Sequence, residues 1–76
     1  MSVEILLPKL GFSMEEGVLS DWLVPDGATV AQGQLIYSLE SEKAIEEIEA
    51  PAPGILRILR PKGVSYPVGT VLGEIL

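Results

Sequence analysis

The 76-residue sequence has no cysteine and no histidine. It can therefore form no disulfide, no zinc site built from thiolates and imidazoles, and no catalytic dyad or triad that depends on histidine. It also lacks any side chain whose unperturbed pKa lies near neutrality, which suits acid–base catalysis best. We therefore expect no metal site and no catalytic activity of the chain's own.

Positive charge is scarce, because five Lys and Arg face eleven Asp and Glu for a net charge of −6. This balance argues against nucleic acid and anionic membranes as partners. Long apolar runs are missing too, since none approaches the ~20 residues of a membrane-spanning helix. The first ten residues include Glu4 and Pro8, which do not suit a signal or transit peptide. We expect a cytoplasmic location, or the mitochondrial matrix in a eukaryote.

Short strands are the elements that the sequence predicts. Six prolines and eight glycines leave apolar stretches of about five to eight residues between them. The one segment of helical composition, 40–49, would place like-charged glutamates at i,i+4, so a strand is preferred there. Alternation puts Leu35, Tyr37 and Leu39 on one face. The expected strands are Val3–Leu7, Val18–Val24, Leu35–Ser41, Ala44–Ala50, Ile55–Arg60 and Val71–Leu76.

An internal repeat organises the chain. Residues 17–27 and 54–63 match in their glycines and proline once one residue of gap is allowed, and the match continues at a constant offset of 36. The quasi-repeats span about 17–40 and 54–76. Halves this short cannot each bury a core alone. We predict one all-β domain over 1–76, a small sandwich or flattened barrel whose halves pack face to face about a pseudo-two-fold axis.

The repeat also places a turn at Glu42 and Lys43, because the equivalent point of the second half lies at Leu76. We predict that this turn and the chain termini lie at opposite ends of the molecule. Lys43 is the only cation in 40–49, a segment with five of the eleven carboxylates. On such a turn a lysine is either a solvated charge that limits aggregation or an accessible amine for modification. The residues alone leave both open.

Four segments, in their order along the chain, carry a family resemblance. They are Leu7–Gly11 with Met14–Gly17, Asp26-Gly27 with Val30 and Gly33, Glu40-Ser41-Glu42-Lys43-Ala44, and Gly54. The third is similar to the motif Glu-Thr-Asp-Lys-Ala, and the glycine follows Lys43 at the family's spacing. Over essentially its whole length the chain resembles the lipoyl domains of the acyltransferase components of 2-oxo acid dehydrogenase complexes.

The resemblance implies a flattened barrel of two four-stranded sheets, with lipoate joined to Lys43 through an amide. The dithiolane would accept an acyl group from a thiamine-dependent decarboxylase, pass it to coenzyme A at the acyltransferase core, and be reoxidised by dihydrolipoyl dehydrogenase. A lipoate ligase or lipoyl transferase would attach the group and recognise Glu40, Glu42 and Ala44. The domain would be a monomeric carrier in a 2-oxo acid or acetoin dehydrogenase complex.

The resemblance also assigns the loop between the first two strands, 8–16, to recognition by the decarboxylase. Phe12 and Met14 are candidate contacts there, and the alternative is that they fold back onto the core. Ile45, next to the lysine turn, is a third candidate contact if it is exposed.

Two positions depart from the family's usual pattern. Glu42 replaces the commoner aspartate and keeps its charge. Glu46 stands where the family usually has an apolar residue, and shares its alternating face with Ala44, so that Ile45 lies on the other face. Either a bulge shifts the register, or Glu46 lies near enough to the turn to reach water.

Three other interpretations remain. A biotinyl domain shares the fold and the hairpin lysine, but the usual Ala-Met-Lys-Met is absent, and neither Met1 nor Met14 adjoins Lys43. The carrier protein of the glycine-cleavage system is longer and contains helix. An unmodified β-sandwich could instead dock a basic partner through its acidic hairpin. The residues do not select among 2-oxo acid and acetoin-like substrates.

Overall fold

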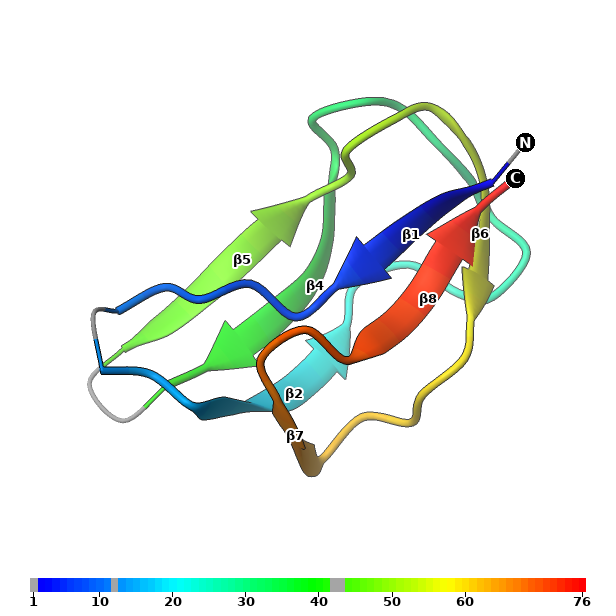
Figure 1. Cartoon of the computed structure of the whole chain (residues 1–76). Helices are drawn as coiled ribbons and strands as arrows, with labels where there is room; N and C mark the ends of the chain where they lie inside the picture. Colours follow the sequence, from blue (N-terminus) through cyan, green and yellow to red (C-terminus); the bar gives the residue numbers. More distant parts are fainter. Residues whose placement is uncertain (1, 12, 42–43) are drawn as a thin grey trace.

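The structure is a computed structural model that describes residues 2–11, 13–41 and 44–76. Within these residues it contains strands and no helix (Figure 1), which confirms the all-β prediction. The strands are β1 Val3–Leu6, β2 Glu16–Trp22, β3 Thr29–Val30, β4 Leu35–Glu40, β5 Ile45–Glu49, β6 Gly54–Ile58, β7 Val64–Pro67 and β8 Val71–Ile75. The described residues thus include no helix that could cross a membrane.

The strands form two four-stranded sheets, as the resemblance implies. The strand orders are β1-β8-β6-β3 and β5-β4-β2-β7, and neighbouring strands in both sheets are antiparallel. The short strands β3 and β7 were not predicted, and each of them crosses to the sheet of the other half, where β3 pairs with β6 and β7 with β2. The halves therefore exchange a strand and do not pack as two separate layers.

Equivalent backbone hydrogen bonds join the two halves. The Gly27 amide donates to the Leu56 carbonyl at 2.7 Å. Its counterpart, the Gly63 amide, donates to the Leu19 carbonyl at 2.6 Å. Because both bonds run from the turn of one half to a long strand of the other, they lock the halves together in a pseudo-two-fold arrangement.

The gap in the sequence repeat corresponds to a β-bulge. Along β2 the pairing with β4 passes from Leu19 opposite Leu39 to Asp21 opposite Ser38, so that Ser20 is skipped. The equivalent pairing of β6 with β8 has no such interruption. The extra residue of the first half is therefore absorbed in the bulge, and the sheets keep the same architecture on both sides of the axis.

The core lies between the sheets. Its fully or almost fully buried members are Ile5, Leu7, Leu19, Val30, Ile36, Tyr37, Leu39, Ala50, Leu56, Leu72 and Ile75. Tyr37 and Leu39 are buried as the alternation predicts, but that prediction is wrong for Leu35, which is exposed. The register of β4 against β5 shifts between Leu35 and Tyr37, and this bulge buries Ile36 in place of Leu35.

The body is elongated, with extents of 32 × 20 × 20 Å. Both termini lie at one end, and β4 ends and β5 begins at the other (Figure 1). The end of β4 and the start of β5, which flank the predicted turn, therefore lie opposite the termini. Residues 42 and 43 themselves lie outside the described residues.

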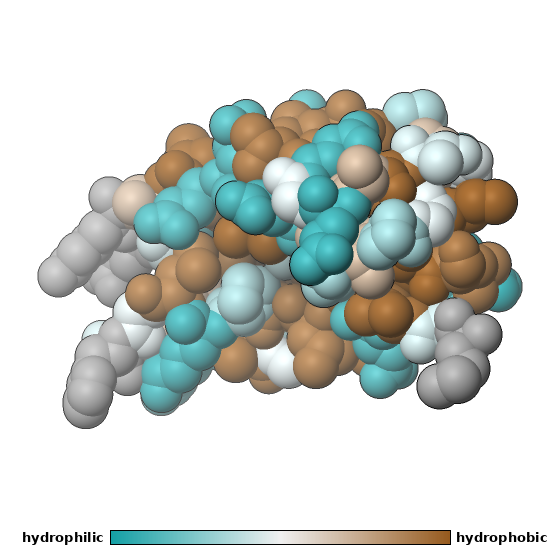
Figure 2. Space-filling model, turned by 90° about the horizontal axis from the view of Figure 1, so that it is seen from above, coloured by the Kyte–Doolittle hydropathy of each residue, from teal (hydrophilic) through white to brown (hydrophobic). Residues whose placement is uncertain are grey.

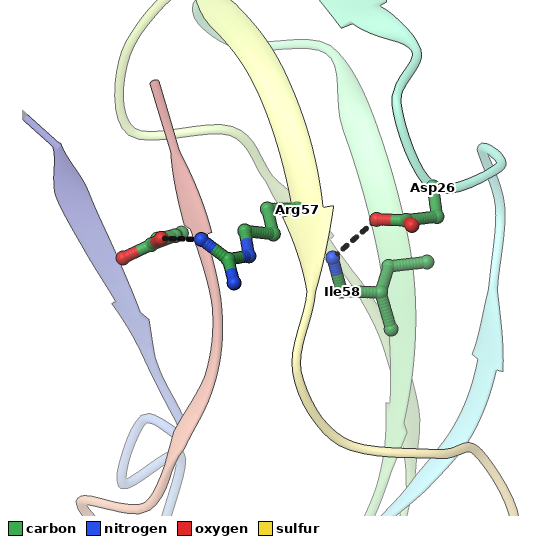
Figure 3. A network of polar contacts seen from close by, with 4 residues as sticks. Asp26, Arg57 and Ile58 are labelled. Carbon is green, nitrogen blue, oxygen red and sulfur yellow. Dashed lines mark hydrogen bonds and ion pairs between the residues drawn. The ribbon is translucent and has the colours of Figure 1, made fainter.

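The polar contacts of β6 include one that joins the two halves and one within the second half. The Ile58 amide donates to Asp26 Oδ1 at 2.7 Å, from strand β6 to the turn that precedes β3 (Figure 3). Arg57 Nη1 lies 3.4 Å from Glu74 Oε1 on the neighbouring strand β8.

Outward-facing apolar and polar residues are interspersed on the face seen in Figure 2.

Candidate functional site

The hairpin between β4 and β5 is closed by two hydrogen bonds. The Ser41 amide donates to the Ala44 carbonyl at 2.8 Å, and Ser41 Oγ donates to the same oxygen at 3.1 Å. Beneath them Glu40 pairs with Ile45 in the antiparallel ladder. Two residues of chain separate Ser41 from Ala44, which is the commonest length for a connection in a β-hairpin.

The predicted site residues fall into two groups. Phe12, Glu42 and Lys43 lie outside the described residues. The others are placed as follows: Glu40, Ala44 and Ile45 are exposed, and Met14 is half-buried. Their roles in attachment and recognition stay predictions.

Ile45 lies on the outer face of the β5-β4-β2-β7 sheet. Its ladder partner is Glu40, which in turn lies opposite Val18 on β2, while the neighbouring Leu19 and Leu39 face the core. The exposed fraction of Ile45 is 64%, the largest among the exposed large hydrophobic residues of the described chain. The hairpin thus presents an apolar side chain to solvent beside its turn.

The position of Glu46 decides between the two explanations for a glutamate on this face, which are a bulge that shifts the register and a place near the turn that reaches water. The β4–β5 register runs without a shift from Glu40 opposite Ile45 to Tyr37 opposite Ile48, and the bulge lies beyond this stretch. Glu46 therefore shares the inward face of Leu39, and it is exposed because it lies near the open end of the sandwich. No bulge is needed to bring its carboxylate to water.

An open groove lies between the hairpin and the loop that joins β1 to β2. Its described lining residues are Leu10, Gly11, Ser13, Met14, Glu15, Glu16, Gly17, Val18, Glu40, Ser41, Ala44, Glu46 and Ser65. Four of these are glutamates, and none of the described lining residues is Lys or Arg. The groove therefore favours a cationic partner surface and disfavours an anionic one. No sequence signal placed the loop here, because its neighbours are about 25 residues away in the chain.

Met14 folds back toward the body of the domain. Its sulfur accepts the Leu10 amide at 3.3 Å, and it packs against the buried core. Its methyl group lies close to Gly17, at 2.7 Å from where a Cβ there would stand. Of the two alternatives predicted for Met14, folding back onto the core describes its packing. The same residue also lines the groove.

Together these features define a two-sheet β domain whose β4–β5 hairpin lies at the end opposite its termini. The biotin/lipoyl family model, described as "Biotin-requiring enzyme", matches residues 3–75. The chain belongs to this biotin/lipoyl attachment family. It is a lipoyl- or biotin-attachment domain of the kind found in dehydrogenase-complex acyltransferases, and such a domain is a carrier and not a catalyst.

Individual relatives agree with this assignment. The chain is 41% identical over 73 residues to the dihydrolipoyllysine-residue acetyltransferase component of the acetoin cleaving system of Bacillus subtilis, covering 95% of this chain and 18% of that protein. It is 42% identical over 64 residues to the corresponding pyruvate dehydrogenase component of Zymomonas mobilis, covering 83% and 14%. The chain thus spans less than a fifth of the length of these relatives.

A solved structure supports the fold. The lipoyl domain of the 2-oxoglutarate dehydrogenase complex from Azotobacter vinelandii superposes with a TM-score of 0.80 at 27% identity. The match covers 97% of this chain and 95% of that one. The predicted resemblance to lipoyl domains is therefore confirmed.

Proposed function

We propose that the chain carries lipoate in an amide with Lys43 and serves a 2-oxo acid or acetoin dehydrogenase complex. The observation that carries this proposal is the closed hairpin, in which Ser41 and Ala44 are hydrogen-bonded and the chain between them contains the single lysine of the segment 40–49. Exposed flanks and an open groove leave room for a modifying enzyme and a long arm. The family assignment and the lipoyllysine names of the relatives favour lipoate over biotin.

When attached, lipoate supplies a disulfide that takes up an acyl group and two electrons. The chain's own residues would position that group and restrict its partners. In this proposal a lipoate ligase or lipoyl transferase recognises Glu40, Glu42 and Ala44. The thiamine-dependent decarboxylase contacts Phe12, Met14 and Ile45. The acyltransferase core and a dihydrolipoyl dehydrogenase complete the set of partners.

The acidic groove supports the expectation that these partner surfaces are basic. Its four described glutamates lie on both of its walls, with Glu15 and Glu16 on the loop side and Glu40 and Glu46 on the hairpin side. The names of similar proteins cover acetoin, pyruvate and 2-oxoglutarate systems, so the proposal extends to the class of complex and not to one substrate.

The test is enzymatic modification of the chain. The purified protein is incubated with lipoate, ATP and a lipoate ligase, and its intact mass and peptide map are then measured, with a biotin ligase and biotin in parallel. We expect one lipoyl adduct on Lys43, no adduct on a folded Lys43→Arg variant, and an unchanged yield for Lys62→Arg. An adduct only with biotin would favour the biotinyl carrier, and no adduct with either would favour an unmodified binding module.

A further inference from the structure

A second depression lies between the edge strands β1 and β5. It has a volume of about 260 Å³ and shares no residue with the groove beside the hairpin. Its lining residues are Glu4, Ile5, Leu6, Pro8, Tyr37, Ile48, Glu49 and Pro51. Both strands stand at the edge of their sheets and are paired on one side only, so no ladder joins the two sheets along this side of the sandwich.

The cleft lies on the pseudo-two-fold axis. Ile5 pairs with Gly73 and Ile48 pairs with Tyr37, and Gly73 and Tyr37 differ by 73 − 37 = 36, the repeat offset. Ile5 and Ile48 are therefore equivalent, and both line the cleft from opposite sides. Its walls are largely apolar but not fully symmetric. Tyr37 stands where the other half has Gly73, and Glu49 is the counterpart of Leu6, because their ladder partners Leu35 and Val71 also differ by the repeat offset.

Tyr37 is one of the residues that line the cleft, and its hydroxyl is an unusual buried group. The residue is fully buried, and among the described residues its oxygen has no hydrogen-bond partner. Burial raises the pKa of Tyr37 from 10.0 to about 12, so the phenol keeps its proton at neutral pH. A buried hydroxyl without a partner is unfavourable, and it remains able to donate one hydrogen bond and to accept others.

The charged residues of the cleft are both acidic. Glu4 and Glu49 are exposed, and the ion pairs found among the described residues, Arg57–Glu74 and Lys62–Asp21, include neither. A ligand that suits this set has an apolar stem for the walls and a cationic head with several donors for the carboxylates and the phenol oxygen. An arginine side chain combines these properties, and its planar guanidinium is less strongly hydrated than a lysine ammonium.

We propose that the cleft between β1 and β5 receives an arginine side chain of a partner protein, with the guanidinium directed at Glu4 and Glu49. The hydroxyl of Tyr37 is buried, so neighbouring side chains shift when the guanidinium reaches it. The site is independent of lipoate on Lys43. It would hold a partner at the side of the domain and leave the hairpin and its groove free.

The experiment is an NMR titration of the ¹⁵N-labelled chain without lipoate. The probe is acetyl-Ala-Arg-Ala-amide, and its matched control carries citrulline, which has the same stem and shape but no charge. We expect saturable amide shifts at Ile5, Leu6, Ile48 and Glu49. Because a charged donor contributes more than a neutral one, the citrulline peptide should bind about tenfold more weakly.

Variants separate the cleft from general acidity. Glu49→Gln and Tyr37→Phe should each weaken binding of the arginine peptide about threefold or more. Glu47→Gln removes the same charge from the same strand at a residue outside the cleft, and should leave the affinity unchanged. Equal binding of the citrulline peptide, equal effects of the Glu47 and Glu49 variants, or shifts centred on the groove beside the hairpin would each overturn the proposal.

Discussion

The indole ring of Trp22 lies over Gly73, with its Cη2 atom 3.4 Å from the position that a Cβ on the glycine would take. The same ring packs against Tyr37 at a centroid distance of 5.4 Å, and its Nε1 donates to the Arg60 carbonyl at 3.0 Å. Tyr37 and Gly73 are equivalent in the repeat. The first half therefore contributes the rings of Trp22 and Tyr37 to the core. In the second half, the absence of a side chain at Gly73 leaves room for the ring of Trp22.

This arrangement predicts that Gly73→Ala is destabilising. The new Cβ would lie 2.6 Å from the Arg57 carbonyl oxygen, and because this atom belongs to the backbone of β6 it cannot rotate away. We expect a loss of about 1–3 kcal/mol in the free energy of unfolding, measured by urea titration. Gly11→Ala is the control, since its nearest neighbour would stand 4.0 Å away. Equal stabilities of the two variants would show that the backbones of β6 and β8 can move apart enough to accommodate the methyl group.

The carboxylate of Asp26 predicts a contrast between two surface aspartates. Its Oδ1 accepts the Ile58 amide at 2.7 Å and joins the turn of one half to a strand of the other. Asp26→Ala leaves that amide without its partner and should cost about 1–3 kcal/mol. Among the described residues the carboxylate of Asp21 pairs with the exposed Lys62 at 3.3 Å, so Asp21→Ala should cost at most about 0.5–1 kcal/mol. Thermal unfolding of both variants at low salt provides the comparison, and a larger loss for Asp21→Ala would contradict the assignment.

The long strands were predictable because proline and glycine mark their ends and apolar residues fill them. The repeat also anticipated the pseudo-two-fold relation between the two halves. Strands β3 and β7 were not predictable, since Thr29–Val30 is two residues long and Val64–Pro67 ends in proline. Such short segments become strands only because a neighbouring strand offers its edge.

The hairpin was predictable for a different reason. The internal repeat makes the break between the expected strands Leu35–Ser41 and Ala44–Ala50 equivalent to the chain end at Leu76, so this segment could be located without knowing the rest of the fold. The groove and the cleft could not be located, because each is formed by segments far apart in the chain. The exposure of Leu35 was missed too, since the bulge at Ile36 depends on how β4 meets β5 and not on the alternation within β4.

The buried phenol predicts a loss of stability in strong base. Unfolded Tyr37 ionises near its ordinary pKa of 10.0, whereas folded Tyr37 does so only near about 12. The contribution of the protonated phenol to the free energy of unfolding is therefore fully present below pH 10. It is lost as the pH rises from 10 to 12, by up to about 2–3 kcal/mol. Urea titrations at pH 8 and 11.5 should show a smaller loss for Tyr37→Phe than for the unchanged chain. The same variant should be at least as stable at pH 8, because it removes an unpartnered buried hydroxyl.

The exposed side chain of Ile45 gives the prediction that separates recognition from folding. Ile45→Ser should change the free energy of unfolding by no more than about 0.5 kcal/mol, because most of the side chain is already in water. If a decarboxylase buries this side chain, the rate constant kcat/KM for reductive acylation of the lipoylated domain should fall about tenfold, which corresponds to about 1.4 kcal/mol.

Ile55→Ser is the matched control for that experiment. Ile55 is also exposed, at 48%, but its amide bonds the Leu76 carbonyl at the end where the termini lie. It should leave the acylation rate unchanged. Equal rates for the two variants would remove Ile45 from the recognition surface and leave the loop between β1 and β2 as the remaining candidate. A loss of lipoylation by the ligase in Ile45→Ser alone, with normal acylation of the molecules that do become modified, would reassign Ile45 to the modifying enzyme.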